Sequence, residues 1–250
     1  GQAMNEEATT LDTQTSFDDY HKSQTSQELG IPDYLQETSW WAYLHPKAVS
    51  FFERQWLVNL ILWGNFARLR DAALNEIGAE FAGSNLQVAC VYGDFSQHAA
   101  SRLAEHARLD IVDVAPVQLE NVRKKVDGFA NVHLHHQNSA DLEFADEAFD
   151  NVILFFLLHE QPEEVRQRTV REALRVVRPG GKVVFVDYHR PRVLNPFRYV
   201  MTPILHFLEP FALDLWNREI RDWIPEQDRP QSIKKQTFFG SLYQKVVVVK

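Results

Sequence analysis

The sequence has one cysteine among its 250 residues, and that scarcity excludes several kinds of protein. A single thiol, Cys90, cannot form an intramolecular disulfide or a zinc cluster built on cysteines, so we expect a reducing compartment. No run of about 18 apolar residues occurs, so no membrane-spanning helix is expected. The first residues lack the basic and apolar regions of a secretory signal, and none is expected.

Clustered positive charge is also absent. The chain holds 26 Lys and Arg against 34 Asp and Glu, which gives a formal net charge of −8. Binding to DNA or RNA depends on grouped Lys and Arg side chains that neutralise phosphates. We therefore expect no nucleic-acid partner.

Glycine is missing where a nucleotide-binding loop would need it. Residues 86–96 read LQVACVYGDFS, which predicts a buried strand over Leu86–Val91, a turn at 92–94 and a helix from about Ser96. A strand, a turn and a helix start form a corner whose backbone N–H groups can face a nucleotide. Glycines usually let the ligand approach such a loop, but here only Gly93 stands in it.

What the sequence does contain is a regular alternation of strands and helices. Strands are predicted at 86–91, 109–114, 132–136, 148–156 and 182–188, and helices at 96–108, 115–126 and 163–177. This spacing predicts an α/β fold with a doubly wound, mostly parallel sheet and right-handed crossovers. Residues 236–249 predict two further strands with a turn near Gly240, which close one edge of the sheet with a C-terminal antiparallel strand.

The chain divides into five predicted parts. Residues 1–28 are polar and acidic and are expected to be disordered, although a helical cap over a ligand is an alternative. Residues 29–80 are rich in Trp, Tyr and Phe and predict a helical cap, which serves either ordinary core packing or a pocket for a flat hydrophobic substrate. Residues 81–190 form the Rossmann-like core, 191–230 a helical insertion on the substrate or membrane side, and 231–250 the closing strands.

Four stretches resemble the class I S-adenosylmethionine-dependent methyltransferases, and in general plan the quinone C-methyltransferases. They are YGDFS at 92–96, IVDVAPVQLENVRKK at 111–125, QNSADLEFADEAFDNVIL at 137–154 and EALRVVRPGGKVVFVDY at 172–188. This resemblance implies a Rossmann-like class I methyltransferase fold and S-adenosylmethionine as the cofactor.

A further resemblance concerns residues 40–74 together with ACVYGDFS at 89–96, which look like the RquA family of rhodoquinone biosynthesis proteins. It implies that ubiquinone is converted to rhodoquinone, with an amino group replacing a ring methoxy group. S-adenosylmethionine would be the amino donor, and a divalent metal, manganese, would assist. Two alternatives stay open: an ordinary S-adenosylmethionine-dependent quinone methyltransferase, and a non-catalytic quinone-handling protein that kept the fold.

The candidate cofactor-binding residues follow the ends of successive predicted strands. A carboxylate at Asp113 can accept hydrogen bonds from both ribose hydroxyls of an adenosine ligand. Val114 is then placed to pack on the adenine, and the Asn138 side chain can hydrogen-bond to it. Val91 and Tyr92 occupy space that glycines normally leave free, which puts the usual methyl transfer in doubt. The full set is Cys90, Val91, Tyr92, Gly93, Asp113, Val114, Asn138, Ser139 and Phe155.

The candidates for catalysis are Tyr92, His159, Tyr43 and His45. A donor or base among them could polarise a quinone carbonyl or move a proton. Asp187 and His189 lie two residues apart in a predicted strand end, so they share a face and could supply an oxygen and a nitrogen ligand to manganese. Packing or helix capping is the alternative role for each of these side chains.

Partners and location follow from the resemblance and from the apolar residues 197–216. We expect a quinone, ubiquinone, as the small-molecule substrate, and peripheral contact with a membrane. The expected location is the cytoplasmic side of a bacterial inner membrane. The oligomeric state is not determined by these patterns.

Overall fold

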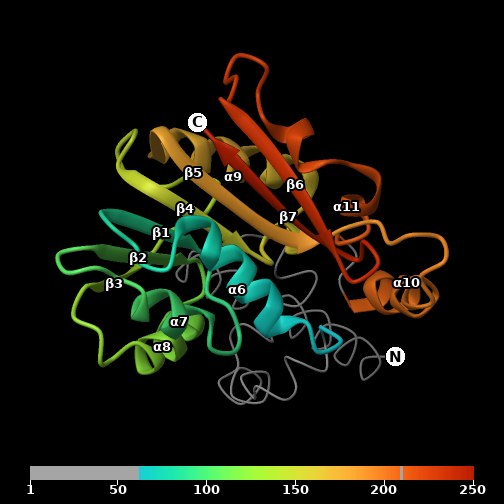
Figure 1. Ribbon diagram of the computed structural model, residues 1–250, viewed down its shortest axis with the longest axis horizontal. Coiled ribbons are helices and arrows are strands. Elements are labelled where there is room, and N and C mark those ends of the chain that lie inside the picture. The colour runs from blue at the N-terminus through green and yellow to red at the C-terminus, as the bar shows by residue number, and fades with distance from the viewer. Residues whose placement is uncertain (1–61, 209–210) are drawn as a thin grey trace, which may run out of the picture.

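The computed structural model describes residues 62–208 and 211–250 of the chain (Figure 1). The predicted tail at 1–28 and residues 29–61 of the predicted cap therefore lie outside the described residues. The helices are α6 (Phe66–Ile77), α7 (Phe95–Ser101), α8 (Pro116–Lys125), α9 (Glu163–Val176), α10 (Phe197–Leu208) and α11 (Asp214–Asn217), with 3-10 turns η1 (Leu158–Glu160) and η2 (Ile220–Trp223). The strands are β1 (Ser84–Val88), β2 (Arg108–Asp113), β3 (Val132–His136), β4 (Phe149–Phe155), β5 (Val177–Tyr188), β6 (Ser232–Phe238) and β7 (Tyr243–Val249).

The strands form one seven-stranded sheet in the order β3-β2-β1-β4-β5-β7-β6. The first five strands pair in parallel, and β7 runs antiparallel between β5 and β6. The prediction of a doubly wound, mostly parallel sheet with a C-terminal antiparallel strand is confirmed. Because β1 lies at the centre, the chain reverses its direction of winding between β1 and β4, where such sheets bind ligands.

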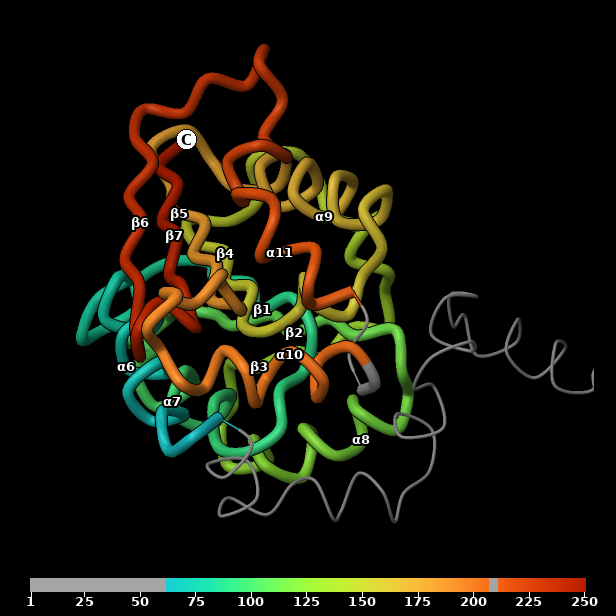
Figure 2. Tube along the Cα trace, turned by 90° about the vertical axis from the view of Figure 1, so that its right-hand side faces the viewer, coloured from blue at the N-terminus to red at the C-terminus, as the bar shows by residue number. Residues whose placement is uncertain are grey.

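The core lies on both faces of the central strands. Residues Val183 to Val186 of β5 are all fully buried, as a strand covered on both faces requires. Helix α6 covers one face of the sheet and α9 the opposite face (Figures 1 and 2). The buried residues of α6, among them Phe66, Leu69 and Ala73, fall at three- and four-residue steps, which is why this stretch forms an amphipathic helix.

The sequence RPGG at 178–181 was predicted to stop a helix and turn, and α9 does end just before it, at Val176. The four residues form an irregular start to β5, because the β4–β5 register jumps from Phe149↔Val177 to Asn151↔Lys182. Gly180 has a φ of +79°, a conformation that favours glycine. A Cβ atom on Gly181 would lie 2.5 Å from the carbonyl oxygen of Asp150. RPGG therefore lets the chain pass close to β4 before it joins the sheet.

The insertion after β5 is tied to the core by one buried arginine. Arg166 of α9 is fully buried, and its Nε donates to the carbonyl oxygen of Leu158 at 2.6 Å. The same guanidinium donates to the carbonyl oxygen of Phe211 and lies over the ring of Trp223. Arg166 thus joins the turn after β4 to the segment that follows α10. None of the described helices is both long enough and apolar enough to span a bilayer.

The close approach at Gly181 generates a stability prediction. Gly181→Ala is expected to lower the free energy of unfolding by about 1–3 kcal/mol, because backbone atoms of Asp150 and Arg178 must move to admit the methyl group. Gly128→Ala is the matched control, since a Cβ there meets nothing within 4 Å. Urea unfolding followed by circular dichroism measures both. Equal stability of the two variants would contradict the packing described.

Candidate functional site

The loop after β1 crosses onto the neighbouring strand β2. The Ala89 N–H donates to the carbonyl oxygen of Val112 at 2.8 Å, and the Cys90 N–H donates to Oδ2 of Asp113 at 2.8 Å. Ala89 has a φ of +75° and Gly93 a φ of +87°. The left-handed conformation costs an L-residue such as alanine about 1 kcal/mol. At Ala89 the loop therefore has a backbone conformation that usually requires glycine. Sequence reasoning did not single out Ala89, because an alanine does not indicate positive φ.

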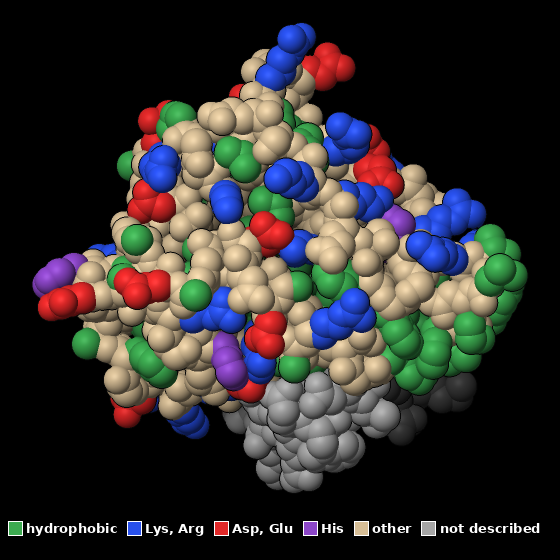
Figure 3. Space-filling view, in the orientation of Figure 1, with side chains coloured by type: hydrophobic (Ala, Val, Ile, Leu, Met, Phe, Trp, Pro, Cys, Tyr) green, Lys and Arg blue, Asp and Glu red, His purple; other side chains and the backbone are tan. Residues whose placement is uncertain are grey.

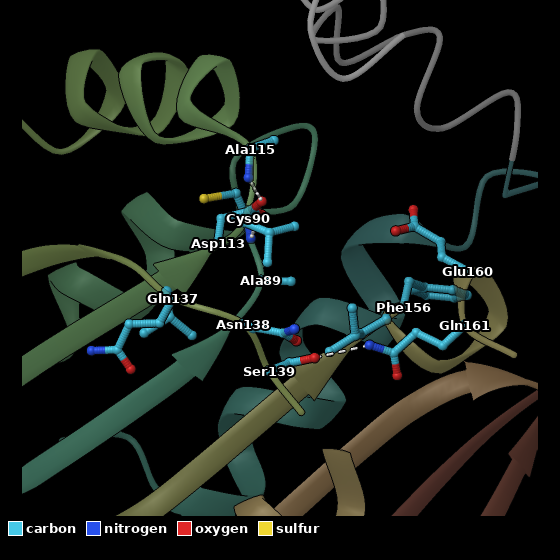
Figure 4. Close-up of a pocket in the computed structure, with 13 residues that line it drawn as sticks. Ala89, Cys90, Asp113, Ala115, Gln137, Asn138, Ser139, Phe156, Glu160 and Gln161 are labelled. Carbon is cyan, nitrogen blue, oxygen red and sulfur yellow. Dashed lines mark hydrogen bonds between the residues drawn. The ribbon is translucent and has the colours of Figure 1, made fainter. Parts of the chain in front are cut away.

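Asp113 ends β2 and closes this corner. Its Oδ2 accepts the Cys90 amide, and its Oδ1 accepts the Ala115 amide at 2.9 Å (Figure 4). Each carboxylate oxygen has two lone pairs, so Asp113 can accept further hydrogen bonds from a ligand in the cavity that it lines.

Burial raises the pKa of the Asp113 carboxyl above its ordinary value, and the bonds from the amides of Ala115 and Cys90 oppose that rise. The folded chain therefore holds a proton on Asp113 more tightly than the unfolded chain does. This group favours the fold most at low pH, and that contribution is lost as the pH rises through the raised pKa.

A cavity opens at the carboxyl ends of β1, β2, β3 and β4 (Figure 4). Five of the predicted cofactor-binding residues line it: Cys90, Asp113, Val114, Asn138 and Ser139. The other lining residues are Ala89, Val112, Ala115, Gln137, Phe156, Leu157, Glu160 and Gln161. The wall thus combines apolar side chains with two carboxylates, Asp113 and Glu160, and a few amide and hydroxyl groups.

Asn138 and Ser139 differ in what they leave for a ligand. The Oδ1 of Asn138 accepts the Ala140 amide at 3.0 Å, so its side-chain NH₂ is the group that can donate into the cavity. The Ser139 hydroxyl lies 3.0 Å from the Thr169 hydroxyl and accepts from Nε2 of Gln161 at 2.9 Å (Figure 4). Asn138 is therefore the better ligand candidate, and Ser139 holds the turn after β3 against α9.

Val91, Tyr92 and Gly93 are not among the residues that line the cavity, in contrast to the prediction. The Tyr92 hydroxyl accepts from Nε2 of Gln118 at 3.0 Å, so the ring lies toward α8. Lys125, at the end of α8, donates to the carbonyl oxygens of Gly93 at 2.8 Å and Val91 at 3.3 Å. The structure thus joins this part of the loop to α8, and Tyr92 does not block the cavity.

Gln87 stands in β1 near a position where the resemblance to methyltransferases implies an acidic residue. It is fully buried, and its Nε2 donates to the carbonyl oxygen of Ala89 at 3.1 Å and to the Ser96 hydroxyl at 3.0 Å. Gln87 therefore holds the loop against the start of α7.

Phe155, predicted to bind the cofactor, does not line the cavity, whereas its neighbour Phe156 does. Phe155 is buried and stacks on Phe95 with ring centroids 4.4 Å apart, so it belongs to the core. Phe156 lines the cavity and has a φ of +54°, which is an outlier for a bulky residue. The strand-end backbone turns at this residue, and a count of alternating faces from the sequence cannot anticipate that turn.

His159 lies behind the cavity wall and contacts two carboxylates. Its Nδ1 is 3.2 Å from Oδ1 of the buried Asp187, and its Nε2 is 3.7 Å from Oε1 of Glu160. Glu160 itself lines the cavity. The predicted catalytic residue His159 therefore reaches the cavity through Glu160, and Asp187 and Glu160 hold it from two sides. Glu160 was not among the predicted catalytic residues.

The predicted metal ligands have different partners. Asp187 contacts His159 and accepts the Tyr188 amide at 2.9 Å, whereas Nδ1 of His189 lies 2.9 Å from the carbonyl oxygens of Ser241 and Arg190. In the part of the chain that the structure describes, no group of three or more His, Cys, Asp or Glu is arranged to hold a metal ion. The manganese prediction therefore finds no support here. Tyr43 and His45 lie outside the described residues.

Comparisons with known proteins agree with this geometry. Residues 86–181 match the family described as "Methyltransferase domain". A demethylmenaquinone methyltransferase from Bacillus licheniformis is 24% identical over 68% of this chain and 73% of its own length.

Two solved structures share the fold at low sequence identity. A SAM-dependent methyltransferase from Aquifex aeolicus aligns with a TM-score of 0.52 and 15% identity, over 82% of this chain and 98% of that one. The N-methyltransferase NodS from Bradyrhizobium japonicum, in complex with S-adenosyl-L-homocysteine, aligns with a TM-score of 0.55 and 12% identity, over 81% and 96%. The seven-stranded mixed sheet and these structural matches show that the chain has the Rossmann-like α/β fold of class I methyltransferases.

Proposed function

We propose that this chain is an S-adenosylmethionine-dependent transferase that acts on a quinone ring. The observation that carries the proposal is the Asp113 carboxylate, which ends β2 at the switch point of a parallel sheet and lines the cavity there. This is the place where such sheets bind the ribose of an adenosine ligand. The family match and the curated relatives support the same assignment.

The cavity residues fit an adenosine group. Asp113 accepts hydrogen bonds from the ribose hydroxyls, and the Asn138 side-chain NH₂ donates to a ring nitrogen of the adenine. Val114 and Ala89 supply apolar walls, and both line the cavity. S-adenosylmethionine brings a sulfonium centre with an electrophilic methyl group and an α-amino group.

Methyl transfer to a quinol is the reaction that the comparisons support better, since relatives named demethylmenaquinone methyltransferase match most of the chain. In this reaction a ring carbon takes the methyl group and a proton must leave the ring. Glu160 is the cavity carboxylate placed to accept that proton, and His159, which also contacts Asp187, lies against Glu160 and positions it.

Amino transfer to ubiquinone is the second candidate, and the altered loop favours it. Lys125 donates hydrogen bonds to the carbonyl oxygens of Val91 and Gly93. Gln87 stands near the position where the resemblance to methyltransferases implies an acidic residue. Both changes alter the surroundings of the amino-acid end of the cofactor, whose amino group is the one this reaction would donate. The resemblance of residues 40–74 and 89–96 to rhodoquinone biosynthesis proteins points the same way. Manganese belongs to this candidate alone.

One incubation separates the candidates. The pure chain is given S-adenosylmethionine labelled with ¹³C in the methyl group and ¹⁵N in the amino group, with either a demethylated quinol or ubiquinone, and with or without manganese. Mass spectrometry of the quinone is expected to show a transferred label. A ¹³C-methyl product supports methyl transfer, and a ¹⁵N-amino product with loss of the methoxy group supports amino transfer. Neither label in any arm would contradict both reactions and leave a non-catalytic quinone-handling protein.

Asp113→Asn tests the cofactor site. This change removes the ionised acceptor, so the affinity for S-adenosylhomocysteine is expected to fall about 10- to 100-fold, as for hydrogen bonds to a charged group. Because the pKa of Asp113 is raised, wild-type affinity should weaken on acidification at a higher pH than an ordinary aspartate would cause. Calorimetric titration at several pH values measures both, with the exposed Asp127→Asn as control. Unchanged affinity in Asp113→Asn would remove Asp113 from the site.

Glu160→Gln tests the proton acceptor. It is expected to lower kcat about 100-fold or more, because the amide cannot take a proton, while S-adenosylhomocysteine affinity stays within about threefold. The matched control is Glu164→Gln, an exposed carboxylate in the first turn of α9. Steady-state kinetics with the quinone that gives product, together with calorimetry, provide the two readouts. A variant that keeps wild-type kcat would exclude Glu160 as the base.

A further inference from the structure

Exposed apolar side chains gather in one short segment. In the part of the chain that the structure describes, the exposed large hydrophobic residues all fall between positions 193 and 204: Val193 (64% exposed), Leu194 (95%), Tyr199 (67%), Val200 (46%) and Ile204 (39%). We refer to these five residues as the 193–204 patch. Figure 3 shows the hydrophobic side chains grouped on the molecular surface where α10 lies in Figure 1. A group of this kind marks an interaction site more often than scattered single residues do.

The 193–204 patch is held in place by the fold beneath it. The side-chain amide of Asn195 donates to the carbonyl oxygens of Phe239 and Gly240, in the turn between β6 and β7. The Arg192 amide also donates to the Gly240 carbonyl oxygen, at 2.9 Å. Met201 and Leu205 bury the inner face of α10. The outward residues therefore form a fixed surface of the domain.

The charge around the patch selects its partner. Residues 190–206 contain three arginines and no Asp or Glu, although the whole chain carries a net charge of −8. Arg190 and Arg192 are both exposed beside the patch. Apolar side chains with a tyrosine among them, bordered by arginines, match the boundary between acyl chains and anionic headgroups of a bilayer.

We propose that the 193–204 patch docks the chain on the surface of an anionic lipid bilayer. Leu194 and Tyr199, the most exposed residues, enter the boundary between headgroups and acyl chains. Arg190 and Arg192 lie against the lipid phosphates. Docking of this kind is peripheral, in keeping with the absence of a spanning helix among the described residues.

The patch lies at the same edge of the sheet as the cavity, because it follows directly after the carboxyl end of β5. A row of aromatic rings links the two places. Phe156 lines the cavity, and the ring centroids along the row are 6.0 Å apart for Phe156–Tyr243, 6.1 Å for Tyr243–Phe239 and 4.9 Å for Phe239–Phe197 of α10. Docking thus brings the substrate side toward the lipid, where a quinone resides. This last consequence rests on the proposed function, whereas the docking does not.

Flotation with vesicles tests the docking without any assay of turnover. The full chain is mixed with vesicles of phosphatidylcholine alone or of phosphatidylcholine with phosphatidylglycerol. The chain is expected to float with the anionic vesicles. The double variant Leu194→Ser/Tyr199→Ser should bind them about tenfold more weakly, because it loses apolar contact with the bilayer. Arg190→Gln/Arg192→Gln should weaken binding and reduce its dependence on salt, and Arg171→Gln, exposed on α9, is the matched control.

Unchanged circular dichroism and unfolding temperature confirm that the variants fold. Wild-type protein that stays at the bottom of the gradient with both kinds of vesicle would overturn the proposal. So would equal flotation of the wild type and the Leu194→Ser/Tyr199→Ser variant. Light scattering that shows a dimer broken by this variant, without flotation of the wild type, would assign the patch to a second copy of the chain instead. Since no cofactor or quinone is present, these outcomes are independent of the labelling experiment.

Discussion

The cavity corner depends on one pair of hydrogen bonds, those by which Asp113 accepts the backbone amides of Cys90 and Ala115. They join the loop after β1 to the end of β2 and the start of α8. A buried carboxylate with two amide donors keeps a fixed orientation, and Asp113 retains lone pairs for a ligand in the cavity that it lines. The same burial disfavours the charged form of Asp113 and so raises its pKa in the unliganded fold. A ligand that donates two hydroxyl groups would offset that effect.

Strain accompanies this arrangement on both walls of the cavity. Ala89 and Phe156 both have positive φ without being glycine, and both line the cavity. Each is held by a bond to a neighbouring strand, from Ala89 to the Val112 carbonyl oxygen and from Phe156 to that of Val186. Backbone strain of this type costs about 1–3 kcal/mol per residue and persists where the surrounding structure fixes it. The hydrogen bonds to the neighbouring parallel strands supply that constraint. Ala89 and Phe156 therefore keep a left-handed backbone conformation that usually requires glycine.

The sequence was sufficient for the sheet and for part of the site. Alternating strands and helices fix the parallel order, and a strand-end aspartate such as Asp113 is recognisable because its position follows from the strand. Tyr92 and Phe155 do not line the cavity, because a side chain at a loop or a strand end points according to local φ values that composition does not reveal. The contact between His159 and Asp187 could not be read from the sequence, because the two residues are 28 positions apart and meet only in the folded chain.

A crystal structure of the chain with S-adenosylhomocysteine would show whether Asp113 binds the ribose. We expect both ribose hydroxyls within hydrogen-bond distance of the Asp113 carboxylate, and the adenine beside Val114 and the Asn138 amide. We also expect Asp113 to keep its bonds to the Cys90 and Ala115 amides. Ligand density elsewhere on the molecule, or an adenosine group that leaves Asp113 uncontacted, would contradict this expectation.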